Sequence, residues 1–283
     1  MLKAFANAKI NLLLDVTGKE ENGYHTVNNI MQTVSLNDTV TLSCDCKGIN
    51  VAYDDGYPVT EKDICLKAVM EYIAYSKKDI DADIFIEKSI PTAAGLGGNS
   101  SAAAAVLSLL NAQYGYLSDE ELLKIAASLG ADVPFFLIGG TALCSHYGEI
   151  ITPVTEFPRM YVVIAKKGNK GATAEMYKKI DQSNATKNTD ITKMLDALKT
   201  KDVDNIIPLM QNVFEDVSSS ESLELIDLIK LSGAKVSMLS GSGPAVFGLF
   251  SDEARADECC KKICDMGISA YLCETTNQGI IIE

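Results

Sequence analysis

The sequence is short of positive charge. Its 283 residues include 25 lysines and arginines against 38 aspartates and glutamates, which gives a formal net charge of −13 at pH 7. A protein this acidic repels the phosphate backbone of nucleic acids and the anionic headgroups of lipids over most of its surface. The composition therefore argues against a dedicated DNA or RNA binder. If the ligand is itself an anion, backbone N–H groups must create a local site against this field.

Long apolar runs are missing as well. No uninterrupted apolar stretch approaches the roughly 18 residues of a membrane span, and Lys9, Asn11 and Asp15 interrupt the apolar segment that a secretion signal would need near the N-terminus. Eight cysteines are present, but no pair of CxxC motifs that would indicate a zinc site. We therefore expect a cytoplasmic protein with reduced thiols and no membrane partner.

The composition is otherwise that of a globular protein, with 47% hydrophobic and 22% charged residues. At roughly 100–200 residues per domain, the length predicts one large domain or two modest ones. Strand patterns occupy residues 5–16, 34–44, 83–88, 160–166, 234–239, 245–250 and 268–274. Helical patterns occupy residues 61–75, 100–113, a segment ending at 181, 189–229 and 252–266, with a capping box at Ser118 and Glu121 opening another.

Strands and helices are mixed in this order without strict alternation, which favours an α+β protein in two lobes. The pattern restarts after about residue 153. We therefore predict domains at residues 1–153 and 154–283. The polar stretch 181–189 is the segment that we expect to be most flexible.

A glycine-rich segment, PTAAGLGGNSS at residues 91–101, leads directly into a predicted helix. Its three glycines let the backbone approach a ligand closely, and the first turn of a helix offers free N–H groups and the positive end of the helix dipole. Together these features predict a cradle for a nucleoside triphosphate. The alternative is an ordinary turn capped by Asn99 or Ser100. Neither GxxxxGK[ST] nor GxGxxG occurs, so Walker and Rossmann fingerprints are excluded.

Lys9 and Asn11 stand in an otherwise apolar strand and point the same way, because residues two apart share a face. A buried lysine needs a carboxylate or a bound anion, whereas on an edge strand Lys9 would face solvent. Asp132 follows Gly130 and precedes Val133-Pro134, a setting that is locally typical of a turn or cap residue. These local patterns leave both alternatives open.

Three further segments carry weaker signals. The second glycine cluster, SGSGP at residues 240–244, lies between two apolar strands and is typical of a hairpin turn. Tyr24 and His25 form a loop that could recognise a planar ring, or simply an amphipathic surface. His146, the second of the two histidines, has a sequence context that favours a structural role.

In chain order, these segments resemble the GHMP family of small-molecule kinases. Within it they resemble the 4-diphosphocytidyl-2-C-methyl-D-erythritol kinases of isoprenoid precursor synthesis. The resemblance rests on AKINL, GKEENGYHTV, MQTVSLNDTV, PTAAGLGGNSSAAAAVL, GADVPFFL and SGSGPAVFGLF, and it runs from about Lys3 to Phe250. The glycine loop and SGSGP are the superfamily signature, and AKINL with the GYH loop is the narrower one.

The resemblance implies a two-lobed α+β GHMP kinase fold, with an N-terminal ATP-binding lobe, a ferredoxin-like C-terminal lobe and the active site in the cleft. It implies an ATP- and Mg²⁺-dependent kinase that phosphorylates the 2-hydroxyl of the cytidyl diphosphate methylerythritol. Lys9 and Asp132 match the catalytic pair. The implied nucleotide contacts are Asp63, Pro91, Thr92, Ala93, Ala94, Gly95, Leu96, Gly97, Gly98, Asn99, Ser100 and Ser101. The implied substrate contacts are Asn11, Tyr24, His25, Thr173, Tyr177, Gly241, Ser242 and Gly243.

The sequence departs from the family pattern at three positions. Asn99 and Ala102 replace a usual glycine and a usual polar residue, and Asp63 replaces a usual asparagine near the adenine. The protein ligands of magnesium and the oligomeric state are not implied. The rival interpretations are a GHMP kinase for mevalonate, phosphomevalonate or homoserine, a catalytically silent ligand-binding relative, and an RNA binder with a similar second lobe. Tyr24, His25 and Tyr177 argue against the first, Lys9 with Asp132 against the second, and the charge of −13 against the third.

Overall fold

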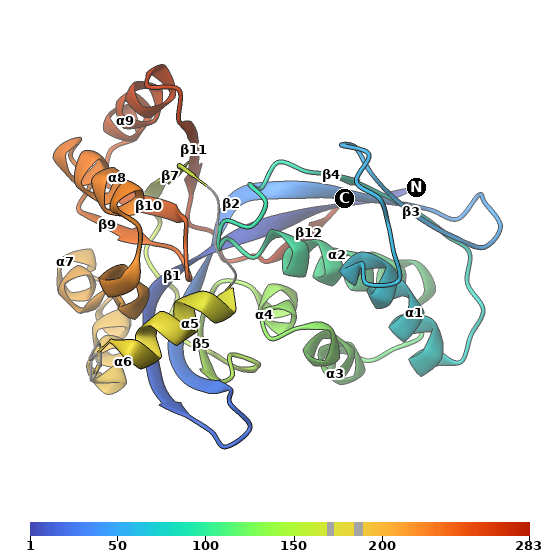
Figure 1. Ribbon diagram of the computed structural model, residues 1–283. Helices are drawn as coiled ribbons and strands as arrows, with labels where there is room; N and C mark the ends of the chain where they lie inside the picture. The colour runs from blue at the N-terminus through green and yellow to red at the C-terminus, as the bar shows by residue number, and fades with distance from the viewer. Residues whose placement is uncertain (169–172, 184–188) are drawn as a thin grey trace.

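The structure, a computed structural model, describes residues 1–168, 173–183 and 189–283. A large sheet is built mainly from strands of the first half of the chain (Figure 1). The strands of this sheet are β1 (Leu2–Lys19), β2 (His25–Ser43), β3 (Ile49–Tyr53), β4 (Ala82–Glu87), β5 (Thr141–His146), β6 (Ile150–Pro153), β8 (Gln211–Asn212) and β12 (Ile280–Ile282). The order is β12-β1-β2-β4-β3, with β5 also beside β2, β6 beside β5 and β8 beside β1.

The long antiparallel hairpin of β1 and β2 forms the centre of this sheet. β1 is buried continuously from Ala6 to Asp15, because β2 pairs along one edge, β12 and β8 pair with parts of the other, and α2 covers it. Three register shifts, the first after Asn7, interrupt the pairing of β1 with β2. Such shifts bend a ribbon and re-aim its side chains. Lys9 and Asn11 lie between two of them.

Helices α1 (Ile64–Ser76), α2 (Gly98–Tyr114), α3 (Asp119–Leu129) and α4 (Val133–Ile138) pack beside the large sheet (Figure 1). α2 lies against β1 and β2, and its fully buried run of alanines at residues 102–105 lets the helix approach the strands closely. Gly97 and Gly115, both with left-handed φ, bound this helix. The capping box of Ser118 and Glu121 begins α3 as predicted, and Gly130 ends it.

The second sheet has the order β11-β7-β10-β9, with antiparallel neighbours. Its strands are β7 (Tyr161–Lys166), β9 (Val236–Leu239), β10 (Ala245–Phe250) and β11 (Ser269–Glu274), and the helices packed on it are α8 (Ser220–Leu231) and α9 (Glu253–Asp265). The chain order strand, helix, two strands, helix, strand is the ferredoxin-like pattern. The predicted two-lobed α+β fold is therefore confirmed.

Between β7 and α8 the chain is less regular than predicted. The helix expected over 189–229 is wrong: the structure has α6 (Ile191–Thr200), α7 (Val203–Ile206), 3-10 turns at Ile207–Leu209 and Val213–Val217, β8 and α8. Pro208 explains one break, since proline lacks the N–H that a continuing helix uses. Capping carboxylates and hydroxyls, such as those of Asp202 and Ser219, explain others. Part of the stretch 181–189 lies outside the described residues.

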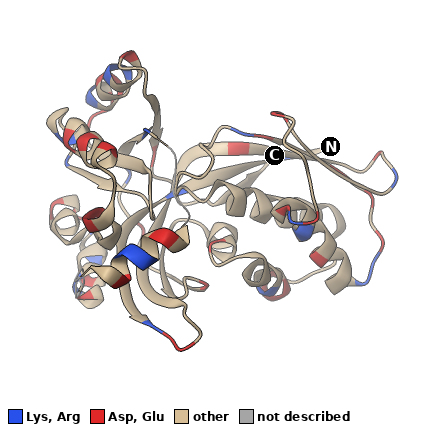
Figure 2. Ribbon diagram, viewed as in Figure 1, with Lys and Arg blue, Asp and Glu red and all other residues tan. Residues whose placement is uncertain are grey.

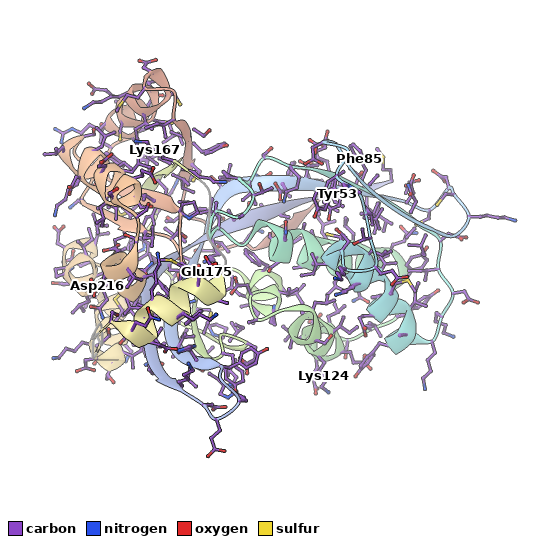
Figure 3. The ribbon with its side chains drawn as sticks, viewed as in Figure 1. Tyr53, Phe85, Lys124, Lys167, Glu175 and Asp216 are labelled. Carbon is purple, nitrogen blue, oxygen red and sulfur yellow. The ribbon has the colours of Figure 1, made fainter. Side chains whose placement is uncertain are left out.

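The two halves of the chain are interleaved in the large sheet. β8 and β12, both from beyond residue 153, pair with β1. The division at residue 153 stays a prediction. In space, Lys167 and Asp216 lie in the lobe that holds the small sheet. Tyr53 and Phe85 lie toward the far end of the large sheet (Figure 3).

Charged residues cluster on the helices and on the tip of the β1–β2 hairpin, while the central strands are largely uncharged (Figure 2). No helix among the described residues is long and apolar enough to cross a membrane.

Candidate active site

A cavity of about 430 Å³ lies between the two sheets. Strands β1 and β2, the loop before α2, the loop before α4, the β5–β6 turn, helix α5 (Thr173–Gln182) and the β9–β10 turn all contribute to its wall. The sequence-predicted residues that line it are Lys9, Asn11, Pro91, Thr92, Ala93, Ala94, Gly95, Leu96, Gly97, Gly98, Asn99, Ser100, Asp132, Thr173, Tyr177, Gly241 and Ser242. The fold thus brings together residues that are more than 200 positions apart.

The glycine loop packs tightly against the rest of the protein. Gly97 has φ +75°, and a Cβ there would lie 2.5 Å from Cζ of Phe136. At Gly95, with φ +85°, a Cβ would lie 2.3 Å from the backbone oxygen of Ser240, in the second glycine cluster. These two glycines are therefore required by packing as well as by backbone conformation.

The first turn of α2 opens onto this cavity. Its N-cap is Gly97, which has no side chain to accept hydrogen bonds from the turn. The next three residues, Gly98, Asn99 and Ser100, line the cavity. Free N–H groups and the positive end of the helix dipole make such a turn an anion site.

Lys9 is buried, with 4% of its surface exposed, and belongs to a polar network. Its Nζ donates to Oδ1 of Asn11 at 2.7 Å, and Nδ2 of Asn11 donates to Oδ1 of Asn29 at 2.7 Å. The backbone N of Gly241 donates to the same Oδ1 of Asn11 at 2.7 Å. Asn11 therefore joins β1, β2 and the second glycine cluster around the ammonium. The edge-strand alternative with Lys9 in solvent is wrong, because Lys9 is buried and its backbone N donates to the oxygen of Leu96 at 3.0 Å.

Asp132 occupies the N-cap position of α4 but makes no side-chain capping bond there. Its carboxylate lines the cavity instead, so the cap interpretation does not account for it. Asp132 and Lys9 also act on a common neighbour. Burial raises the pKa of the Cys144 thiol, the charge of Asp132 raises it further, and the charge of Lys9 opposes this. Both charges therefore lie within electrostatic reach of one side chain.

Lys88 is a cavity residue that the sequence interpretation missed. Its ammonium pairs with the carboxylate of Asp38, which is fully buried and also accepts from the backbone N of Ser89 and of Ile90 at 2.8 Å each. The sequence feature that could have indicated Lys88 is its position at the end of a strand, three residues before Pro91 of the glycine-rich segment. Among the described residues, Lys9 and Lys88 thus bring two ammonium groups to the cavity wall, with the carboxylates of Asp132 on the wall and of Asp38 behind Lys88 as their counter-charges.

Another part of the wall, formed by Tyr147, Tyr177 and Phe214, is aromatic. The rings of His25 and Tyr177 stack with centroids 4.7 Å apart, and Phe214 meets Tyr177 edge-on at 5.0 Å. Burial raises the pKa of Tyr177 to about 12, with a smaller contribution from the charge of Asp132. Nε2 of His25 lies 2.6 Å from Oδ1 of Asp181, whose other oxygen accepts from Lys19 at 2.5 Å. These contacts fix α5 to the β1–β2 hairpin.

Tyr24 and His25 lie near the cavity without lining it. Tyr24 is 65% exposed, and its ring tilts against that of Tyr147 at 5.5 Å. Tyr147 does line the cavity and was missed, because its contact with Tyr24 spans more than 120 residues of sequence. Tyr177 stacks on His25. The sandwich of a base between Tyr24 and Tyr177 stays a prediction.

Besides Tyr24 and His25, three predicted residues are not among those that line the cavity. Ser101 donates its hydroxyl to the backbone oxygen of Asn7 at 2.6 Å. Asp63 caps α1, accepting from the backbone N of Cys65 and of Leu66 at 2.9 Å, and its other oxygen accepts from Tyr53. Gly243 has φ +78° and lies beside Leu239. Ligand contacts by these three residues stay predictions.

Comparisons with known proteins agree with this geometry. Residues 63–140 match the GHMP kinases N terminal domain, and residues 194–269 match the GHMP kinases C terminal domain. A 4-diphosphocytidyl-2-C-methyl-D-erythritol kinase of Clostridium botulinum (strain Kyoto / Type A2) is 37% identical over 260 residues, covering 90% of this chain and 92% of that protein. One of Clostridium kluyveri is 38% identical over 274 residues, covering 93% and 95%.

Solved structures give the same result. A 4-(cytidine 5'-diphospho)-2C-methyl-D-erythritol kinase superposes with a TM-score of 0.83 and 29% identity, covering 96% of this chain and 98% of that one. The mevalonate kinase of Methanococcus jannaschii, at TM-score 0.78 and 16% identity over 98% of both chains, shares the fold. The chain therefore belongs to the GHMP kinases and, within them, to the family of the 4-diphosphocytidyl-2-C-methyl-D-erythritol kinases.

Proposed function

We propose that the protein transfers the γ-phosphoryl group of ATP to the 2-hydroxyl of 4-diphosphocytidyl-2-C-methyl-D-erythritol, giving the 2-phosphate and ADP. The observation that carries this proposal is one cavity that holds the glycine loop, Lys9 with Asp132, and the aromatic Tyr177. These are the three parts that the reaction needs: a phosphate cradle, charged groups at the point of transfer and a surface for a base. The proposed place of the enzyme is the non-mevalonate route to isoprenoid precursors.

The glycine loop and the first turn of α2 fit a triphosphate. Backbone N–H groups at this turn and the ammonium groups of Lys9 and Lys88 supply positive charge where the phosphates would lie. Magnesium, when bound, neutralises charge on the triphosphate. No cluster of three or more metal-ligating side chains occurs among the described residues, and Mg²⁺ commonly takes its ligands from phosphates, water and only one or two protein carboxylates. Asp132 and the hydroxyl of Ser100 are the cavity side chains suited to that role.

Lys9 and Asp132 are the proposed catalytic residues. Phosphoryl transfer depends mainly on positioning and charge neutralisation. A carboxylate with a reference pKa of about 3.9 is a weak base toward an alcohol in the ground state. Asp132 therefore aligns the hydroxyl and accepts its proton late, as the bond to phosphorus forms. Lys9 neutralises charge on the transferring group, and Asn11 holds Lys9 while contacting the polyol.

Thr173, Tyr177, Tyr24 and His25 are the proposed contacts of the cytidyl group, with Gly241 to Gly243 beside the diphosphate. This aromatic wall favours the cytidyl substrate over mevalonate, phosphomevalonate or homoserine, whose kinases share the loop but need no base pocket. The presence of both Lys9 and Asp132 on the cavity wall favours an active enzyme over a silent relative.

A direct assay tests the proposal. ADP release would be followed with MgATP and, in turn, the cytidyl substrate, mevalonate, phosphomevalonate and homoserine. We expect turnover with the cytidyl substrate alone. Turnover with one of the other alcohols and none with the cytidyl compound would overturn the substrate assignment, and no turnover with any of them would favour a silent relative.

Asn99→Asp tests the phosphate cradle. An aspartate in the first turn of α2 favours the helix dipole, so we expect the melting temperature to hold or rise. The same charge repels the triphosphate at short range, and we expect the Kd of MgATP to rise about tenfold or more. Calorimetric titration with MgATP measures this, with Gln113→Glu at the exposed other end of α2 as a control for the added charge. Unchanged ATP affinity in Asn99→Asp would remove this turn from the nucleotide site.

Tyr24→Ala tests the base pocket. Because Tyr24 is largely exposed, its removal should leave the fold intact. Stacking of an aromatic side chain on a base is worth about 1–3 kcal/mol in nucleic-acid systems, and we expect a loss of this size in binding of the cytidyl substrate with ATP binding unchanged. Tyr75→Ala, at an exposed tyrosine of α1, is the matched control. Equal substrate affinity in the two variants would argue against a stack on Tyr24.

A further inference from the structure

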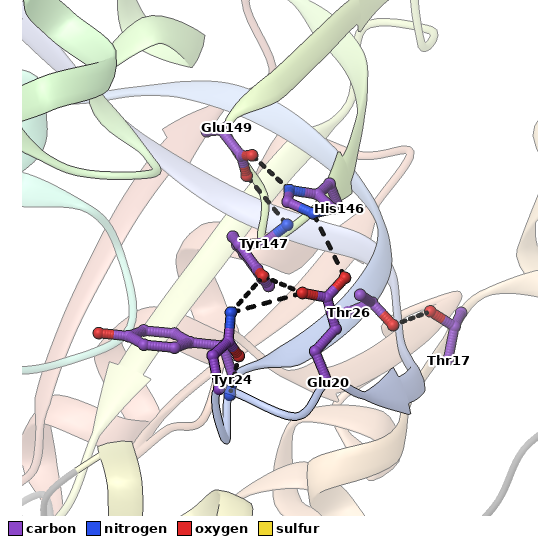
Figure 4. Close-up of polar contacts among 8 residues, drawn as sticks. Thr17, Glu20, Tyr24, Thr26, His146, Tyr147 and Glu149 are labelled. Carbon is purple, nitrogen blue, oxygen red and sulfur yellow. Dashed lines mark hydrogen bonds and ion pairs between the residues drawn. The ribbon is translucent and has the colours of Figure 1, made fainter.

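The tip of the β1–β2 hairpin is joined to the β5–β6 turn by a set of polar contacts that the proposed reaction does not use (Figure 4). The hydroxyl of Tyr147 donates to a carboxylate oxygen of Glu20 and accepts from Nδ2 of Asn22 at 2.8 Å. Nδ1 of His146 lies 2.5 Å from Oε1 of Glu149, and its Nε2 lies 3.6 Å from Oε1 of Glu20. We call these five residues, Glu20, Asn22, His146, Tyr147 and Glu149, the hairpin latch.

The latch leads directly to the proposed substrate site. Oδ1 of Asn22 accepts from the backbone N of Tyr24 at 2.9 Å, which fixes the start of the segment that carries Tyr24 and His25. Tyr147 lines the cavity and meets the ring of Tyr24. Holding Glu20 and Asn22 on Tyr147 therefore holds Tyr24 at the cavity entrance.

His146 is the centre of charge in the latch. Its ring faces two carboxylates, Glu149 from its own turn and Glu20 from the hairpin, and it contacts Tyr147 at a centroid distance of 3.8 Å. Oε2 of Glu149 also accepts from the backbone N of Tyr147 at 2.9 Å, so Glu149 orients both residues. A protonated imidazole has a donor for each carboxylate, whereas a neutral one has a single N–H. Loss of the proton leaves Glu20 and Glu149 as like charges with one donor between them.

We propose that Glu20 and His146 are positioning residues for the cytidyl substrate, which hold the Tyr24 segment against Tyr147 when His146 is protonated and release it when His146 is neutral. The proposal rests on the proposed function, because it assigns the same cavity a pH-dependent affinity for the same substrate. Neither residue lines the cavity, and both act through Tyr147, Asn22 and Tyr24.

The direction of the effect follows from the partners of His146. Its hydrogen bond to Glu149 raises the pKa of His146 above its ordinary value, and the charges of Glu149 and Glu20 add to this. A group whose pKa is raised in the ordered state stabilises that state fully at low pH, and this stabilisation is lost as the pH rises through the raised pKa. Substrate affinity is therefore highest on the acidic side and falls as the pH rises.

The test compares the parent with His146→Gln, Glu20→Gln and the control Glu21→Gln, which makes the same charge change at an exposed neighbour. Calorimetry gives the Kd of the cytidyl substrate, and separately of MgATP, from about pH 6 to about pH 9, the range in which such a histidine titrates. Titration of the substrate itself is common to all four proteins and cancels in the comparison. Melting temperatures confirm that each variant is folded.

We expect the substrate Kd to rise with pH in the parent and in Glu21→Gln. Across this range the rise should be about two- to fivefold larger than in His146→Gln, which is the size of effect that an exposed charge pair supports. Glu20→Gln should lose the pH dependence as well, and the Kd of MgATP should follow one profile in all four. If the parent phosphorylates the cytidyl substrate but its Kd follows the same pH profile as that of His146→Gln, the latch proposal is overturned and the proposed function stands. A parent that does not phosphorylate this substrate overturns the proposed function and the latch with it.

Discussion

Asp132→Asn is expected to lower kcat by about 10²–10⁴-fold, the contribution of a positioned acid–base group, while the Kd of both substrates changes only a few-fold. Asparagine keeps the size of the side chain and one acceptor oxygen but removes the charge and the basicity. Because the carboxylate of Asp132 does not cap α4, the variant should keep its melting temperature. A loss in kcat without a matching loss in binding is the mark of an interaction made mainly in the transition state.

Lys9→Met extends this test to the other member of the pair. Methionine keeps much of the apolar stem in a buried site, and Asn11 retains its bond from the backbone N of Gly241 when the ammonium is removed. We expect a loss in kcat of similar size. The double variant should be scarcely worse than the worse single one, because residues that act as a unit are not additive.

Turnover, substrate affinity and melting temperature would be measured on the same preparations, with Asp119→Asn in the first turn of α3 as a control for an aspartate-to-asparagine change. If Asp132 is only a turn residue, the variant should melt earlier and turn over normally where folded. A folded Asp132→Asn enzyme with turnover within a few-fold of the parent would exclude Asp132 from the mechanism.

Asp38→Ala is expected to cost about 3–5 kcal/mol in the free energy of unfolding, the usual penalty for removing one partner of a buried ion pair. Asp38 is fully buried, and its carboxylate pairs with the ammonium of Lys88 and accepts hydrogen bonds from two backbone N–H groups. Its removal leaves a nearly buried ammonium without its carboxylate. Because Lys88 lines the cavity, the affinity for MgATP should fall as well.

Urea unfolding followed by circular dichroism measures this loss. Asp38→Ala combined with Lys88→Met should recover part of the stability, because the unpaired charge is then absent. Asp196→Ala is the matched control: it breaks an exposed pair with Lys199 at 2.8 Å and should cost about 0–1 kcal/mol. Equal losses in Asp38→Ala and Asp196→Ala would show that burial adds nothing to the Asp38–Lys88 pair.

Elements with a strong local pattern could be predicted from the sequence to within a few residues. Helix α2 and strands β7 and β10 are examples, because alanine and leucine periodicity or a compact apolar run defines them. The short strands β3 and β12 were not predicted, since their pairing depends on partners far along the chain. The sequence 189–229 has helical composition, but Pro208 and the capping side chains divide it.

The candidate site likewise has residues that a local pattern indicates and residues that only tertiary contacts reveal. Lys9 and Asn11 share a face as the two-residue period of a strand requires, and the glycine loop lines the cavity, while its contact with a nucleotide stays a prediction. Ser101 belongs to the same motif, but it lies further around the first turn of α2 and bonds to Asn7 instead. Lys88 and Tyr147 were not predicted, because only tertiary contacts with Asp38 and with the hairpin tip give them a role.

The pairing of β12 with β1 has a consequence for synthesis of the chain. Residues Ala4 to Ala6 pair with Ile280 to Ile282, and the backbone N of Asn7 donates to the oxygen of Gly279 at 2.9 Å. During synthesis β1 leaves the ribosome well before β12, so at about 5–20 residues per second this edge of β1 stays unpaired for on the order of tens of seconds. An open apolar edge of this kind pairs readily with other chains. A message that stops a few codons before Gly279 would therefore yield an aggregation-prone fragment rather than a slightly shorter enzyme.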